Sequence, residues 1–213
     1  MSNTTFGLMV LTMSVEDLFH KPVKKLKKFV SMCPELSVAS RLSLRATRSN
    51  PSTNPQPPAP SSHPPVLSLL SGKVVVDYAC GPGRYTIPTA RMVGPTGKVF
   101  AIDIQPLAID IVKREGAKAG LANIEARLID SFDTGLPDAT ADVVLLIDAI
   151  TPITDREPLL KEIHRLLKPE GVLFVDSSHM SVKQAQAIVE ETNLFDLVKV
   201  DGKEMVWGKR KQS

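Results

Sequence analysis

Cysteine and aromatic residues are scarce in this chain: its 213 residues include two cysteines, one tryptophan and two tyrosines. Cys33 and Cys80 lie in very different contexts and do not have the paired spacing of zinc ligands. These features argue against a disulfide framework and against a structural zinc site. We therefore expect a reducing, cytoplasmic setting.

Long apolar runs and a strong charge of either sign are also absent. No apolar run approaches the roughly 20 residues that cross a bilayer, and the apolar stretch 6–13 lacks the preceding basic residue and the cleavage site of a signal peptide. The formal net charge is only +3, which does not by itself indicate a nucleic-acid partner. We expect no membrane association, no nucleic-acid partner and a small-molecule substrate, and the sequence does not indicate an oligomeric state.

The first third of the chain divides into two regions. Residues 1–32 carry apolar residues at helical spacing, and we expect an N-terminal helical lid there. The lysines between positions 21 and 28 are interpreted as a solvated helix face. Residues 33–66 are rich in proline and serine and have no sustained period, so we expect a disordered insertion. A regulatory or partner-binding linker is the alternative.

From residue 67 to residue 209 the pattern alternates between strands and helices, and residues 210–213 form a short basic tail. This alternation predicts an α/β domain with a doubly wound, mostly parallel sheet. The expected strands are 73–78, 98–104, 124–129, 141–147 and 172–176, followed by a hairpin of 195–200 and 204–208. The expected helices are 84–92, 106–119, 156–167 and 182–192.

The most informative segment, Asp77-Tyr-Ala-Cys-Gly81-Pro-Gly83, ends the first predicted strand of this domain. Glycines permit a sharp turn and let a ligand approach the backbone. Asp103 ends the next strand, twenty positions after Gly83, where a carboxylate can accept both hydroxyls of a ribose. Since ligands of such sheets bind at the carboxyl ends of the strands, Asp130, Asp148 and the segment 176–179 should face the same site.

Residues 73–208 resemble a class I, Rossmann-like S-adenosylmethionine-dependent methyltransferase, of the type 11 or type 25 methyltransferase-domain kind. The matching pieces are the glycine loop, Gly97-Lys-Val-Phe-Ala-Ile-Asp103, Asp130-Ser131, Ala141-Asp-Val-Val-Leu-Leu-Ile-Asp148 and Leu160-Lys-Glu-Ile-His-Arg-Leu-Leu-Lys-Pro-Glu-Gly171. The resemblance implies a seven-stranded sheet of order 3-2-1-4-5-7-6 with strand 7 antiparallel. It also implies S-adenosylmethionine as cofactor and an unidentified acceptor.

The resemblance also assigns roles to individual residues. Ala79, Gly81 and Gly83 would line the methionine part of the cofactor, with Asp77 fixing the loop and the amino group. Asp103 would hold the ribose and Ile104 would lie against the adenine. Asp130 would accept from the adenine amine with Ser131 beside it, and Asp148 would border the methyl-transfer site.

His179 is the candidate catalytic base, because it follows the fifth strand and a neutral imidazole can accept a proton from the acceptor. A surface or capping histidine is an equally good interpretation. Asp148, Asp176 and His179 could instead converge on magnesium, but the preferred expectation is no metal. Tyr78 and Tyr85 are candidates for the pocket wall.

Two other functions remain open at this stage. A nicotinamide-dependent oxidoreductase, NAD(P)-linked, would want a third glycine at position 86, which is threonine. A non-catalytic nucleotide- or RNA-binding module is suggested only by the lysines of residues 21–28.

Overall fold

The computed structural model describes residues 24–26, 28, 70–177 and 179–211 of the chain. The predicted insertion at 33–66 and most of the predicted lid at 1–32 lie outside the described residues. None of the helices in the described part of the chain has the length and apolar character needed to span a membrane.

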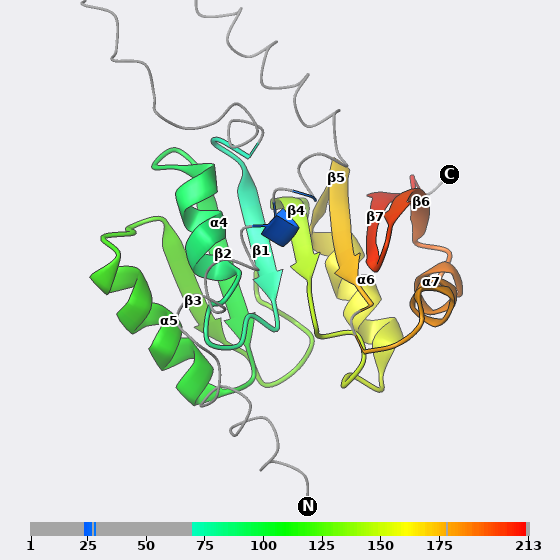
Figure 1. Ribbon diagram of the computed structural model, residues 1–213, viewed down its shortest axis with the longest axis horizontal. Coiled ribbons are helices and arrows are strands. Elements are labelled where there is room, and N and C mark those ends of the chain that lie inside the picture. The colour runs from blue at the N-terminus through cyan, green and yellow to red at the C-terminus, as the bar shows by residue number, and fades with distance from the viewer. Residues whose placement is uncertain (1–23, 27, 29–69, 178, 212–213) are drawn as a thin grey trace, which may run out of the picture.

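Seven strands form one sheet in the order β3-β2-β1-β4-β5-β7-β6, which confirms the predicted topology (Figure 1). All neighbouring strands are parallel except β7, which is antiparallel to both β5 and β6. The strands are β1 (Val74–Tyr78), β2 (Lys98–Asp103), β3 (Ile124–Leu128), β4 (Ala141–Leu146), β5 (Leu167–Asp176), β6 (Phe195–Asp201) and β7 (Glu204–Lys209).

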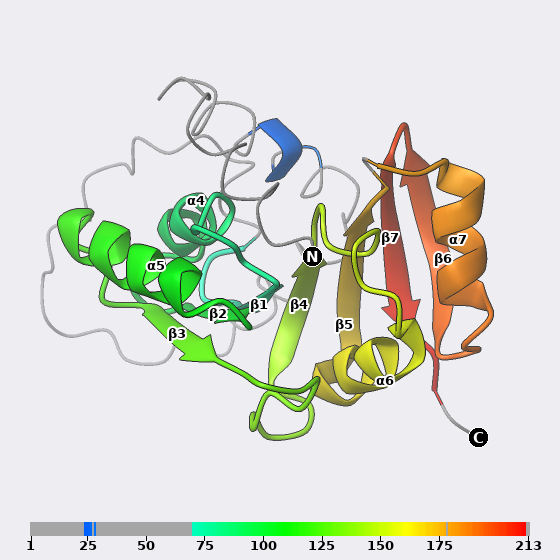
Figure 2. The same ribbon diagram turned by 90° about the horizontal axis from the view of Figure 1, so that it is seen from below.

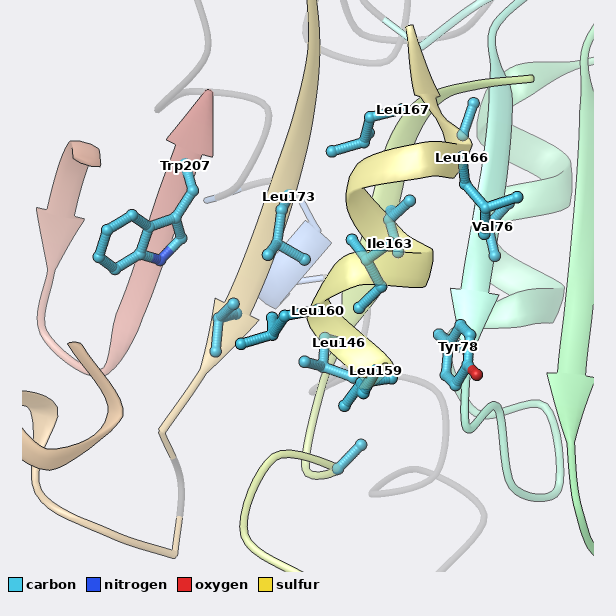
Figure 3. Packing of buried hydrophobic residues seen from close by; sticks show 14 of the residues in the cluster. Val76, Tyr78, Leu146, Leu159, Leu160, Ile163, Leu166, Leu167, Leu173 and Trp207 are labelled. Atoms are coloured by element: carbon cyan, nitrogen blue, oxygen red, sulfur yellow. The ribbon is translucent and has the colours of Figure 1, made fainter. Parts of the chain in front are cut away.

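Helices cover both faces of this sheet because the central strands are apolar on both sides. The helices are α4 (Thr86–Val93), α5 (Pro106–Lys118), α6 (Arg156–Leu166) and α7 (Val182–Glu190). Figure 2 shows α4 and α5 on one side of the sheet and α6 on the other. The α6 side holds the larger core cluster, in which Leu173 of β5 lies beside Leu160 and Ile163 of α6 and which extends to Trp207 of β7 (Figure 3).

Several boundaries differ from the sequence-based expectation for clear reasons. Pro88 lies in the first turn of α4, where its missing N–H breaks no helical hydrogen bond. Strand β5 begins at Leu167, directly after α6 and five residues before the predicted start, since Leu167 pairs with Ala141 of β4. Gly120 follows α5 with φ of +66°, as expected for a glycine that ends a helix.

A short helical stretch at residues 24–26 and 28, here called the N-terminal turn, packs on the sheet although the strands lie much further along the chain. Leu26 is fully buried in the core cluster that also contains Phe174 of β5 and Val206 of β7. In Figure 2 this turn lies on the α4 side of the sheet, above β4 and β5. It therefore fills a part of that face that α4 and α5 leave uncovered.

Candidate active site

The loop after β1 combines left-handed backbone with a tight turn. Ala79, Gly81 and Gly83 have φ values of +58°, +52° and +84°. Such angles cost a non-glycine residue about 1–3 kcal/mol, and they are often found at ligand sites. A Cβ built on Gly81 would meet no atom within 4 Å, so the loop has open space on that side.

Gly83 is required for a different reason. A Cβ at this position would come within 3.0 Å of the Val112 Cγ2 atom of α5, so glycine here allows the loop to pack closely against α5. The two glycines of the loop therefore have different surroundings, since Gly81 borders open space and Gly83 lies against a neighbouring helix.

Asp77 is almost completely buried beneath the loop and has one strong partner. The Thr86 hydroxyl donates to Asp77 Oδ2 at 2.5 Å. Burial raises the pKa of Asp77 to about 7, and the nearby Asp103 carboxylate adds to the rise. Sequence reasoning treated Thr86 only as a missing glycine, whereas its hydroxyl fixes the acid that begins the loop.

Asp103 connects the loop to the end of β2. Its Oδ2 accepts from the Gly81 N–H at 2.8 Å, and its Oδ1 accepts from the Gln105 N–H at 2.9 Å. Each carboxylate oxygen has a second lone pair. The same side chain can thus hold the glycine loop in place and still accept hydroxyl groups from a ligand, which fits the ribose expected here.

A shallow groove of about 760 Å³ lies beside Asp103 at the ends of β2 and β3. It gathers three predicted residues, Ile104, Asp130 and Ser131, together with Leu128 and Ile129, which the sequence analysis did not single out. Ile104 is 63% exposed and Leu128 is 52% exposed. Apolar side chains next to a carboxylate and a hydroxyl fit a flat heteroaromatic ring with polar edges.

The walls of this groove are held from below by the neighbouring elements. The Tyr78 hydroxyl at the end of β1 donates to the Phe132 carbonyl at 2.8 Å. Glu162 of α6 accepts from both the backbone N–H and the hydroxyl of Thr134. Tyr78 therefore supports the groove indirectly, by holding the backbone at Phe132. Burial raises the pKa of its hydroxyl well above the usual range.

A second group of polar residues lies at the ends of β4 and β5. Asp148 has a left-handed φ of +57°, and Asp176 is buried with an exposed fraction of 1%. Lys25 of the N-terminal turn forms an ion pair with Asp176 Oδ2. The Lys25 Nζ atom also lies 5.7 Å from the centre of the Tyr85 ring. The sequence analysis placed Lys25 on a solvated helix face, and its pairing with buried Asp176 corrects that interpretation. The contact was not anticipated because nothing local in the sequence links residues 151 positions apart.

Two other predicted residues contribute less to this arrangement. His179 follows β5 but its side chain is exposed, and its catalytic role stays a prediction. Among the described residues, no three histidine, cysteine, aspartate or glutamate side chains come close enough to hold a metal ion. Cys80 is a buried free cysteine, and burial raises the pKa of its thiol, as expected for a packing residue and not for a nucleophile.

Comparison with known proteins matches residues 69–210 to a family described as "Methyltransferase domain". Among curated relatives, a demethylmenaquinone methyltransferase of Geobacillus stearothermophilus is 29% identical over 50% of this chain and 45% of its own length. A ubiquinone/menaquinone biosynthesis C-methyltransferase of Hydrogenovibrio crunogenus is 32% identical over 50% of this chain and 42% of its own length. The chain thus spans less than half the length of these relatives.

Solved structures agree on the fold. A SAM-dependent methyltransferase from Aquifex aeolicus superposes with a TM-score of 0.59 at 24% identity, over 64% of this chain and 82% of that one. The family match covers most of the described domain, and the sheet has the order and the single reversed strand of that fold. The chain therefore belongs to the methyltransferase-domain family.

Proposed function

We propose that this protein is an S-adenosylmethionine-dependent methyltransferase that acts on a small-molecule acceptor. The observation that carries the proposal is the position of Asp103, whose carboxylate lies between the open side of the glycine loop and the apolar groove. The curated relatives are named for methylating quinone precursors, which supports a small acceptor. Family membership favours this reading over a nicotinamide oxidoreductase.

Different residues would bind chemically different parts of the cofactor. Ala79 and Gly81 would lie along its methionine part, with Gly83 closing the turn and Asp77 fixing the loop from below. Asp103 would accept from the ribose hydroxyls. When bound, S-adenosylmethionine supplies a methyl group attached to a positively charged sulfur.

The groove would hold the base of the cofactor. Ile104 and Leu128 would pack on the faces of the adenine, because both are exposed apolar side chains at the rim. Asp130 and Ser131 line the same groove and would bond the polar edge of the ring. Asp148, at the end of β4, would border the acceptor. The chain's contribution to rate is then mainly to orient the two reactants and to exclude water.

Isothermal titration calorimetry with S-adenosylhomocysteine tests this proposal. We expect wild-type protein to bind S-adenosylhomocysteine and to give no heat with oxidised or reduced nicotinamide cofactors. Asp103→Ala should weaken binding by about 10- to 100-fold, since a lost hydrogen bond to a charged group costs about 1.5–3 kcal/mol. Asp110→Ala, which changes an exposed aspartate of α5, is the matched control and should bind as wild type does. Absence of heat from the folded wild-type protein would refute the proposal.

A further inference from the structure

The Lys25 ammonium lies beside Asp176 and Tyr85, which are not among the residues proposed above to bind the cofactor. Its Nζ atom pairs with Asp176 Oδ2, and only 19% of the lysine side chain is exposed. The Tyr85 ring lies 5.7 Å away, within the range in which an aromatic face attracts a cation. An alkylammonium group is therefore already seated against a carboxylate and an aromatic ring.

The second carboxylate oxygen of Asp176 shows that this arrangement is incomplete. Asp176 Oδ1 is buried and has no hydrogen-bond partner among the described residues. A buried acceptor without a partner destabilises the folded protein. Phe174, two residues earlier on β5, packs in the same cluster as Leu26, so Asp176 faces the N-terminal turn. The free oxygen is thus placed to accept from a group on this side of the sheet.

The surrounding charges also favour a cation over an anion. Burial lowers the pKa of Lys25, while the carboxylates of Asp148 and Glu204 act to raise it. Arg84 and Lys203 lower it in addition, and the Arg84 guanidinium lies 5.8 Å from the Tyr85 ring. The carboxylates of Asp148, Asp176 and Glu204, at the end of β4, the end of β5 and the start of β7, thus all act on the partly desolvated Lys25 ammonium.

We propose that Asp176, Asp148 and Tyr85 form the acceptor subsite for an amine, and that Lys25 occupies this subsite in the free protein as an internal stand-in. The inference deepens the proposed function and rests on it. An amine acceptor would displace the Lys25 ammonium from Asp176 and take its place beside Tyr85. The end of β5 then selects the substrate class, and Lys25 competes with the substrate.

The chemistry of transfer gives Asp176 a second task. An amine arrives protonated and has no free electron pair, so one N–H proton must first pass to Asp176 Oδ1. The freed nitrogen pair then forms the bond to the methyl carbon, while the electron pair of the carbon–sulfur bond stays on sulfur. The nitrogen carries the positive charge that the sulfur loses, and the adjacent carboxylates stabilise it.

Lys25→Ala opens the subsite, and n-butylammonium, which reproduces the lysine side chain, serves as the probe. With S-adenosylhomocysteine bound, calorimetry should show saturable binding of n-butylammonium to the variant at least tenfold tighter than to wild type. With S-adenosylmethionine present instead, mass spectrometry should detect N-methylbutylamine. Lys24→Ala, a change at the exposed neighbouring lysine, is the control and should behave as wild type.

Two further variants locate the site. Lys25→Ala combined with Asp176→Asn should lose n-butylammonium binding, and Lys25→Ala combined with Asp148→Asn should weaken it several-fold. The variant with Asp148→Asn should still fold, because asparagine tolerates the left-handed backbone of position 148, so a loss of binding in it reports on the subsite. Equal binding to wild type and Lys25→Ala, tighter binding of butyrate than of n-butylammonium, or binding without methylation would each overturn the inference. Binding of S-adenosylhomocysteine in the same samples shows that such a failure leaves the proposed function intact.

Discussion

Single residues in this protein carry charges or backbone angles whose effects can be measured directly. Asp77 is the clearest case, because a carboxylate with 2% of its surface exposed is held by one threonine hydroxyl and lies near a second acid. The loop glycines are the second case, because two residues of the same type at a spacing of two meet very different surroundings. Both cases give predictions at this scale.

Asp77 should make the free protein less stable as pH rises. Its folded pKa of about 7 lies above the ordinary value of 3.8, so between these values the folded state retains a proton that the unfolded state releases. Its contribution is fully present below about pH 4 and is lost as pH rises to about 7, at a cost on the order of 4 kcal/mol. Urea unfolding from pH 4 to 8 should show this fall in wild type and a flatter profile in Asp77→Asn. Identical profiles would contradict the assignment.

Gly81→Ala and Gly83→Ala should separate binding from stability. Both place a Cβ on left-handed backbone, which costs about 1 kcal/mol or more. At Gly81 the new methyl group enters open space on the loop, so S-adenosylhomocysteine affinity should fall by more than the melting temperature suggests. At Gly83 it meets Val112 at 3.0 Å, so the loss should be mainly in stability. Calorimetry and thermal unfolding of both variants measure the two effects, and a reversed ranking would refute the division of roles.

At the scale of elements, the connection from β3 to β4 depends on one buried cluster. Residues 129–140 contain no helix, yet they form the wall of the groove. Burial acts to raise the pKa of Glu162, but its hydrogen bonds with Arg165 and Thr134 outweigh this effect and lower it. Arg165 also donates to the Leu136 carbonyl and to Asp138, so α6 holds the connection at several points.

Glu162→Ala should release this connection. The substitution removes the acceptor of the Thr134 N–H and hydroxyl, and a lost hydrogen bond to a charged group costs about 1.5–3 kcal/mol. The loosened Thr134 segment should also weaken S-adenosylhomocysteine binding. Glu157→Ala is the matched control in the same helix, because its pair with Lys161 is exposed to solvent and should contribute little to stability. Denaturant unfolding and calorimetry measure both quantities. Equal effects of the two substitutions would show that the cluster does not support the groove.

At the scale of the whole molecule, the N-terminal turn is part of the core and not only a cover. Leu26 has no exposed surface and packs with residues of β1, α4, β5 and β7. Lys28 strengthens the contact by donating to Glu204 at 2.7 Å and to the Asp201 carbonyl at 2.9 Å. Leu26 lies before the domain boundary that composition predicts at residue 67, yet it shares one core with residues that lie after that boundary.

Leu26→Ala should destabilise the entire domain. Truncating a fully buried leucine costs about 2–5 kcal/mol, and the loss should appear as a single shifted unfolding transition if the turn and the sheet unfold together. Lys24→Ala should change stability by less than about 0.5 kcal/mol. Urea unfolding followed by circular dichroism makes the comparison. An unchanged midpoint for Leu26→Ala would show that the turn is an independent lid.

The sequence by itself determined the order of strands and helices and the loop with Asp103, because periodicity and glycine-rich turns are local signals. The resemblance carried by those motifs supplied the strand order. Asp130, Ser131 and Ile104 could be placed in one groove because parallel strands end at the same edge. Only the tertiary structure decided what lies across that edge. The pairing of Lys25 with Asp176, the burial of Leu26 and the support of Thr134 by Glu162 each join residues distant in the chain. Such contacts leave no periodic trace in the sequence, since their energy comes from desolvation and packing that exist only after the chain has folded.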